Sequence, residues 1–190
     1  MLRRAEQMDQ TRQRIVDAAV ELHGSVGPAA TTISAIADLA GVTRVTVYRY
    51  FPDDAALFSA CSAHWLSQQQ LPNPGAWAEI SDSATRLATG LADMYRFYDA
   101  GQDMLTNIYH DVAAMPKELQ QNLEDREDLF RDVLAAPFDS APDKLRLIRA
   151  VIGHAVSFWT WHSLCVTHGL SQQEAVDLLT RTVTAVAAQT

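Results

Sequence analysis

Residues 42–51 carry hydroxyl, guanidinium and phenol side chains between apolar ones, and they include no acidic residue. Such groups hydrogen-bond phosphate oxygens and base edges, whereas the outer face of an ordinary bundle helix is mostly Glu, Lys and Gln. If the run is helical, its outer face carries Tyr48 to one side of four further residues: Thr43, Arg44, Thr46 and Arg49. The residue types therefore predict contact with nucleic acid here.

The same ten residues alternate β-branched and aromatic side chains, which would favour a strand. No other segment offers a partner strand, and a lone strand leaves its backbone groups unpaired. Val42, Val47 and Tyr50 or Phe51 can also face inward at helical spacing. We therefore expect a helix.

Residues 32–51 have the pattern of a helix-turn-helix. Ala37 is small where the two helices would cross, and Gly41 falls in the turn, where a positive φ is easiest for glycine. A small core would hold the two helices at a fixed angle: Ile36, Val42 and Val47. The alternative is an ordinary helical hairpin, and the acid-free outer face argues against it.

Apolar residues at helical spacing recur through the whole chain, so we predict an all-α fold. A three-helix DNA-binding domain is expected over residues 1–52, a linking helix over 53–71, and a helical-bundle domain over 72–190. The boundary rests on a segment rich in proline and glycine at 71–75. The predicted helices cover residues 9–26, 33–40, 42–51, 53–70, 77–99, 102–113, 116–135, 143–167 and the C-terminal segment after Ser171, where Ser171 and Glu174 have the spacing of a capping box.

The net charge of −8 is unevenly distributed. Residues 1–52 hold six arginines and five acidic residues, a net charge of +1, and the remainder of the chain carries −9. Because phosphates respond to local positive charge, the acidity of the second half does not exclude nucleic-acid binding by the first.

Residues 10–58 resemble the TetR (tetracycline-repressor) family. The matching stretches are Thr11–Ala18, Gly27, Thr31–Ala37, Ala40–Arg44, Val47–Phe51 and Leu57–Phe58. The other residues match only as an all-helical domain of suitable length. The resemblance implies a homodimeric transcriptional regulator that binds double-stranded operator DNA, dimerises through its last two helices and binds a small-molecule effector. It further implies a repressor that the effector releases, with no cofactor.

The resemblance also implies roles for individual residues. Thr32 would cap the second helix and contact phosphate, and Thr43 and Arg44 would open the recognition helix. Thr46 would face the major groove. Tyr48 and Tyr50 would hydrogen-bond phosphates, with core packing as the alternative for each. Arg49 would contact either a phosphate or a base.

The sequence departs from the family pattern in two places. Val45 stands where members often have glycine, and its methyl groups could meet a thymine methyl. Asp53 and Asp54 stand where members often have a lysine, so we expect a phosphate contact to be lost there. Compensating charge would come from the N-terminal arm and first helix: Arg3, Arg4, Arg12 and Arg14.

Aromatic residues with polar tips are frequent in the second half and would suit a pocket for an apolar or aromatic effector. Core packing or a dimer contact is the alternative for each, and Trp161 in particular could lie on the dimer face. The candidates for ligand binding are Trp77, Tyr95, Tyr98, Tyr109, His110, Trp159 and His162.

Enzymatic function is not expected, because neither a nucleophile elbow nor a glycine-rich phosphate loop is present. His154 and His162 are too far apart along a helix to share a metal, so no metal site is predicted. A helical protein-interaction module remains the second alternative. No apolar run is long enough for a membrane span, no secretory signal is expected, and two isolated cysteines, Cys61 and Cys165, favour the cytoplasm.

Overall fold

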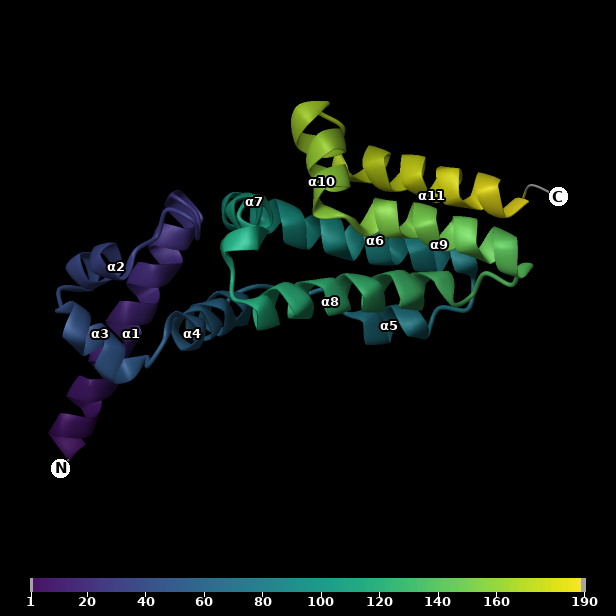
Figure 1. Cartoon of the computed structure of the whole chain (residues 1–190). Helices are drawn as coiled ribbons and strands as arrows, with labels where there is room; N and C mark the ends of the chain where they lie inside the picture. The colour runs from purple at the N-terminus through teal and green to yellow at the C-terminus, as the bar shows by residue number, and fades with distance from the viewer. Residues whose placement is uncertain (1, 189–190) are drawn as a thin grey trace. The chain divides into compact units, whose positions relative to one another are not determined.

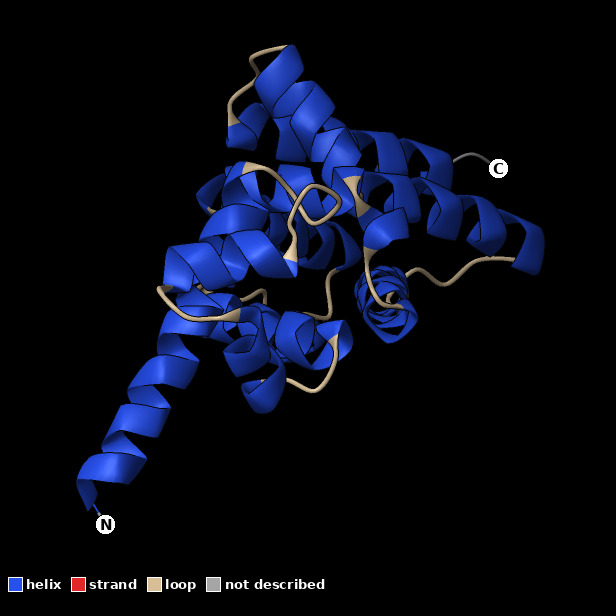
Figure 2. Ribbon diagram, turned by 60° about the vertical axis from the view of Figure 1, so that its left-hand side comes forward, coloured by secondary structure: helices blue, strands red, loops and turns tan. Residues whose placement is uncertain are grey.

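The computed structural model describes residues 2–188, with side chains from residue 6 onward. Its elements are helices, with no strand in the described part of the chain (Figure 1; Figure 2). In chain order they are α1 (Leu2–Ser25), α2 (Ile33–Ala40), α3 (Arg44–Tyr50), α4 (Asp54–Ser67), α5 (Pro74–Ala78), α6 (Ser83–Ala100), α7 (Gln102–His110), a 3-10 turn (Val112–Ala114), α8 (Lys117–Ala135), α9 (Pro142–Val156), α10 (Phe158–Trp161), a π-helical turn (His162–Thr167) and α11 (Gln172–Ala188). The predicted all-α fold is confirmed.

The chain folds into two compact units. The first unit combines Met1–Gln69 with Gly101–Gln120, and the second combines Gln70–Ala100 with Gln121–Thr190. Helix α7 thus packs with the N-terminal helices, although it follows α6 directly in the sequence.

Helix α7 is held to the end of α1 by polar contacts as well as by packing. The Asn107 amide nitrogen donates to the carbonyl oxygens of His23 and Gly24, at 3.1 and 2.9 Å. A carboxylate oxygen of Asp111 accepts from the backbone N–H of Ala29 at 2.9 Å, and this hydrogen bond lowers the pKa of Asp111. The last carbonyl oxygens of a helix have no hydrogen-bond donor within that helix, and the Asn107 amide is the donor for two of them here.

The core of the first unit is apolar and lies between α1, α2, α3 and α4. Its buried residues are Ile15, Val16, Ala18, Ala19, Ile36, Ala37, Ala40, Val47, Phe51, Leu57 and Cys61. Residues 33–40 and 44–50 are helical as predicted, so packing in this core overrides the strand preference of the β-branched residues in α3.

Helix α9 ends at a break that the sequence does not reveal. The predicted single helix to residue 167 is wrong, because Ser157 is extended, with φ −64° and ψ 135°. The break deprives the carbonyls of Ala155 and Val156 of their helical partners. The hydroxyls of Tyr95 and Tyr98 donate to these two carbonyls at 2.7 and 2.8 Å. Buried tyrosines of α6 therefore stabilise the end of α9.

The predicted helix over residues 77–99 is likewise divided, into α5 and α6. The Arg86 guanidinium donates to the carbonyl oxygens of Ala78 and Ile80, at 2.9 and 2.6 Å. Asp82 accepts from a backbone N–H in the first turn of α6 at 2.8 Å and so caps that helix. These hydrogen bonds stabilise a turn where apolar spacing alone predicts continuous helix.

No helix within residues 2–188 is long and apolar enough to cross a membrane. Over the same residues, no three His, Cys, Asp or Glu side chains are grouped as metal ligands would be. The capping box predicted at the start of α11 is confirmed, since the Glu174 carboxylate accepts from both the backbone N–H and the hydroxyl of Ser171, at 2.9 and 2.7 Å.

Candidate functional site

Helices α2 and α3 have defined starts and a defined turn between them. The Thr32 hydroxyl accepts from the N–H of Ala35 at 3.1 Å and caps α2. Gly41 ends α2 in the left-handed conformation, with φ +65°, which glycine adopts without steric cost. The Thr43 hydroxyl then accepts from the N–H of Thr46 at 3.2 Å and caps α3. Capping at both helices sets the direction in which α3 presents its side chains.

The outward face of α3 lies opposite a fully buried valine. Val47 is 0% exposed in the core of the first unit. Val45 precedes it by two residues, or about 200° around the helix, and is 79% exposed. Arg44, Tyr48 and Arg49 are exposed as well. The structure therefore brings Arg44, Val45, Tyr48 and Arg49 together on one exposed face.

The remaining candidate residues of this region lie differently. The Thr43 and Thr46 hydroxyls are 3.0 Å apart, and the Thr46 side chain is only partly exposed. Tyr50 is half-buried and packs against the core, which agrees with the alternative of core packing for this residue. The Arg49 guanidinium lies 5.4 Å from the centre of the Tyr50 ring. Thr32 remains exposed at the start of α2.

Asp53, at the flank of α3, has a structural role. Its carboxylate accepts from the N–H of Ala56 at 2.7 Å and caps α4. Asp53 and Asp54 are both exposed, so two negative charges remain beside the positive end of the α4 dipole. Capping therefore explains Asp53, and Asp54 suits the first turn of α4, whereas the loss of a phosphate contact there stays a prediction.

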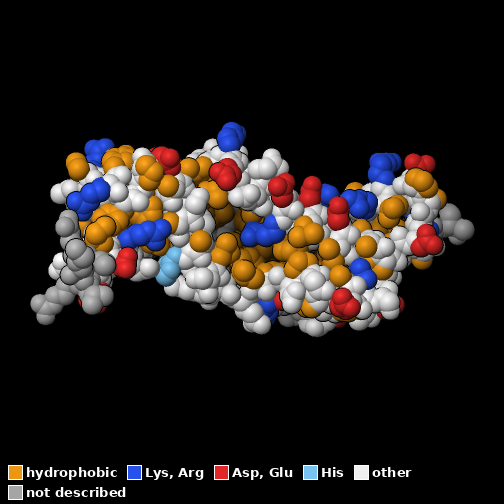
Figure 3. Space-filling model, turned by 90° about the horizontal axis from the view of Figure 1, so that it is seen from below, with side chains coloured by type: hydrophobic (Ala, Val, Ile, Leu, Met, Phe, Trp, Pro, Cys, Tyr) orange, Lys and Arg blue, Asp and Glu red, His pale blue; other side chains and the backbone are white. Residues whose placement is uncertain are grey.

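Two arginines of α1 lie beside the helix-turn-helix. The Arg12 guanidinium is 5.0 Å from the Phe51 ring centre, within the range of a cation–π contact. A guanidinium nitrogen of Arg14 lies 3.7 Å from where a Cβ at Gly41 would be. The side chains of Arg3 and Arg4 lie outside the described residues. On the face drawn in Figure 3, Lys and Arg side chains lie among hydrophobic ones over the first unit.

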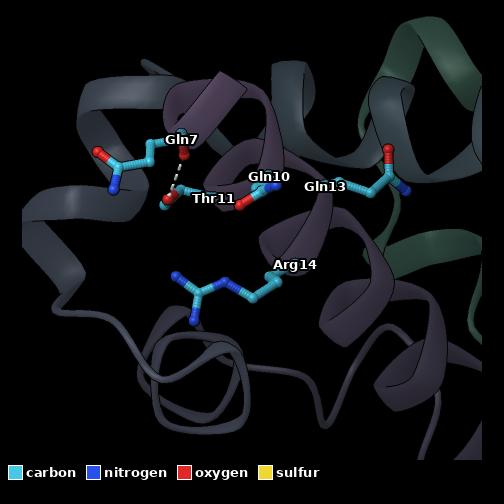
Figure 4. A pocket seen from close by; sticks show the side chains of 5 residues that line it. All are labelled: Gln7, Gln10, Thr11, Gln13 and Arg14. Atoms are coloured by element: carbon cyan, nitrogen blue, oxygen red, sulfur yellow. Dashed lines mark hydrogen bonds between the residues drawn. The ribbon is translucent and has the colours of Figure 1, made fainter. Parts of the chain in front are cut away.

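A hollow of about 620 Å³ lies along the N-terminal part of α1. Figure 4 shows polar side chains of this helix around it, with the Thr11 hydroxyl donating to the Gln7 carbonyl at 2.9 Å. Its lining is Gln7, Gln10, Thr11, Gln13 and Arg14. The glutamines were not among the predicted site residues, although their three-residue spacing places them near one another on the helix.

Four aromatic candidates for ligand binding lie around the start of α10 in the second unit. Tyr95 and Tyr98 are buried, and burial raises the pKa of the Tyr95 phenol. The Phe158 ring packs edge-on against Tyr98, with ring centres 5.4 Å apart. His162 lies 5.6 Å from the exposed Trp159 ring and 5.9 Å from Phe158. The hydroxyls of both tyrosines are already engaged at the end of α9.

The other three ligand candidates do not join this group. Trp77 is buried in the second unit, donates to the Asp93 carboxylate at 3.0 Å and packs against Phe130. Tyr109 and His110 belong to α7 in the first unit. Trp161, which was not in the predicted ligand set, lies beside Tyr98 at 5.8 Å. Its buried indole nitrogen has no hydrogen-bond partner among the described residues.

Known sequences resemble the segment that contains the helix-turn-helix. The family described as bacterial regulatory proteins, tetR family, matches residues 15–61. A curated relative, the HTH-type transcriptional regulator AcrR of Shigella flexneri, is 43% identical over 54 residues. That match covers 28% of this chain, and the chain spans only a quarter of the length of this relative.

Solved structures resemble the chain over nearly its full length. NalD of Pseudomonas aeruginosa is 20% identical, with a TM-score of 0.62 over 95% of this chain and 97% of that one. A TetR-like transcriptional regulator from Rhodococcus sp. RHA1 is also 20% identical, with a TM-score of 0.66 over 94% and 97%. At this identity the likeness shows a shared fold. Residues 15–61 therefore match the tetR family of bacterial regulatory proteins, and the chain as a whole shares the fold of these two solved structures.

Proposed function

We propose that this protein binds operator DNA through α3 and represses transcription. The observation that carries the proposal is the exposed face of Arg44, Val45, Tyr48 and Arg49, on a capped helix without acidic residues. Arginine and tyrosine side chains contact phosphates and bases, and a helix of this kind fits the major groove. The names of the relatives support it: AcrR is a transcriptional regulator, and NalD is described as the secondary repressor of the MexAB-OprM multidrug efflux pump.

The active form in this proposal is a homodimer that pairs through the C-terminal helices. Helices α9 and α11 pack side by side in the second unit (Figure 1). They and the segment between them carry large apolar side chains that are exposed in the single chain: Leu147, Val166 and Leu178. Apolar area of this kind is typical of subunit interfaces. A dimer would place two α3 helices in successive major grooves.

Control by a small molecule completes the proposal. The aromatic group around Tyr98, Trp159 and His162, with the unpaired Trp161 indole beside it, supports a site in the second unit for an aromatic ligand. A ligand that binds more tightly to the conformation that cannot bind DNA would increase the population of that conformation and release the protein from the operator. Trp77, Tyr109 and His110 are left out of this site, because they lie elsewhere in the structure.

The test of DNA binding starts from a random-sequence duplex pool, from which the full-length chain selects its preferred site. We expect affinity to fall steeply with salt, and Arg44→Ala to weaken binding by about tenfold or more. Lys117→Ala is the matched control, because it removes an exposed positive charge from α8. The proposal fails if no sequence is enriched, or if both variants bind as the unmodified chain does.

Dimerisation has a separate test. Sedimentation at micromolar concentration should give a dimer, and Leu147→Glu on α9 should shift it towards monomer. Leu129→Glu on α8 is the control, because Leu129 is equally exposed but lies outside the proposed interface. A monomeric unmodified chain, or equal effects of the two substitutions, would count against pairing through α9 and α11.

A further inference from the structure

Val45 is the most exposed large hydrophobic side chain among the described residues, at 79%. It contributes nothing to the core, because α3 directs Val47 inward and Val45 to the opposite side. Nor does helix propensity favour it, since a β-branched residue is a poorer helix former than alanine. Local folding therefore gives no reason for a valine at this position.

The neighbours of Val45 indicate what would cover it. Arg44 and Tyr48 lie to one side of Val45 on the exposed face of α3, and Arg49 lies to the other. Helix α3 itself has no acidic residue, so the valine sits at the centre of a positively charged face. A polyanionic partner complements this charge. The major groove of DNA offers one apolar group to such a side chain, the C5-methyl of thymine.

We propose that Val45 reads the C5-methyl group of a thymine in each half of the operator, and so helps to determine which sequence is bound. This inference rests on the proposed function, because it requires α3 to enter the major groove. Arg44 and Arg49 bring charge to the phosphates or to guanine, and Val45 adds a preference that charge alone does not provide.

Replacement of thymine by deoxyuridine tests this contact, because it removes the methyl group and leaves the hydrogen-bonding edge unchanged. The duplex selected by the full-length chain is resynthesised with each thymine replaced in turn, and affinity is measured by fluorescence anisotropy at one salt concentration. Buried apolar groups contribute about 0.8 kcal/mol for each methylene-sized unit, which is about fourfold in affinity. We expect one thymine in each half-site to show a loss of about this size.

Two alanine variants identify the side chain responsible. Val45→Ala removes the contact from an exposed position where folding should be unaffected. Val26→Ala is the matched control, because Val26 is an exposed valine of the first unit beyond the end of α1, at 53% exposure. We expect Val26→Ala to keep the fourfold loss with deoxyuridine, and Val45→Ala to show no loss at that thymine.

Three results would overturn the inference. The first is that no deoxyuridine replacement weakens binding, and the second is that Val45→Ala keeps the full sensitivity to it. The third is that Val45→Ala binds the unmodified duplex as tightly as the original chain, which would indicate that another partner covers the valine. In all three the chain still binds DNA, so they differ from failure of the proposed function, in which no duplex is selected at all.

Discussion

A buried histidine makes the stability of the first unit depend on pH. His23 of α1 is 6% exposed, with its ring 4.7 Å from the Phe58 ring and its Nδ1 3.4 Å from the Cys61 sulfur. Burial lowers the pKa of the imidazole from 6.5 to about 4. Burial also raises the pKa of the Cys61 thiol to about 12, so this neighbour offers no charge to an imidazolium. His23 is therefore held in its neutral form.

The direction of the pH effect follows from this shift. Because the folded-state pKa lies below the unfolded one, the unfolded chain takes up the proton first as the pH falls. The contribution to the free energy of unfolding is complete above about pH 6.5 and decreases as the pH falls towards about 4. The loss is about 2 kcal/mol by pH 5 and about 3 kcal/mol below pH 4, at 1.36 kcal/mol for each pKa unit.

Urea unfolding of the full chain, followed by circular dichroism at pH 8, 6.5, 5 and 4, measures this loss. His23→Gln and His23→Leu provide the comparison, because neither side chain titrates. Both should remove about 2 kcal/mol from the difference between pH 8 and pH 5, whatever their stability at pH 8. Carboxylates titrate in all three proteins and cancel in the comparison. If the variants lose stability between pH 8 and pH 5 as steeply as the unmodified chain, His23 is not the group responsible.

Three further predictions concern single residues, and the first two compare a substitution with a matched control. Gly27→Ala should lower the free energy of unfolding of the first unit by about 1–3 kcal/mol in thermal melts, since Gly27 has φ +85° and a Cβ would lie 2.6 Å from a carboxylate oxygen of Asp111. Gly169→Ala is the control: Gly169 has φ +71° and a Cβ there would have nothing within 4 Å, so the substitution should have only the smaller backbone cost. Val47→Ala should cost about 2 kcal/mol in urea unfolding, whereas Val45→Ala should cost nothing, and equal effects would contradict the orientation of α3. Tyr98→Phe leaves a buried carbonyl of α9 without its donor and should cost about 1–3 kcal/mol; an unchanged unfolding midpoint would show that this hydrogen bond does not stabilise the helix end.

Local chemistry explains why the helix-turn-helix could be recognised in the sequence. Thr32 and Thr43 cap helices within three residues of themselves, and Gly41 supplies the positive φ of the turn without help from distant groups. The strand-like residues of α3 had to be interpreted against their own propensity. That interpretation succeeded because Val47 finds a core to enter, and no partner strand competes.

The second half was less predictable, because distant residues determine its breaks. The apolar spacing is the same on both sides of Ser157, so nothing local marks the end of α9. The donors that make the break tolerable are the hydroxyls of Tyr95 and Tyr98, about sixty residues earlier in the chain. Residue type suggested that both tyrosines belong to a ligand site. It could not show that their hydroxyls already donate hydrogen bonds to backbone carbonyls of α9.

The sequence by itself determined the helical class, the helix-turn-helix and the acid-free face around Arg44, because these depend on residues close together in the chain. Only the tertiary structure decided which aromatic side chains lie near one another. It assigned α7, with Tyr109 and His110, to the first unit, since Asn107 supplies the partners that the last carbonyls of α1 lack. Tertiary structure also made Val45 the exposed centre of α3, because the burial of Val47 sets the rotation of that helix.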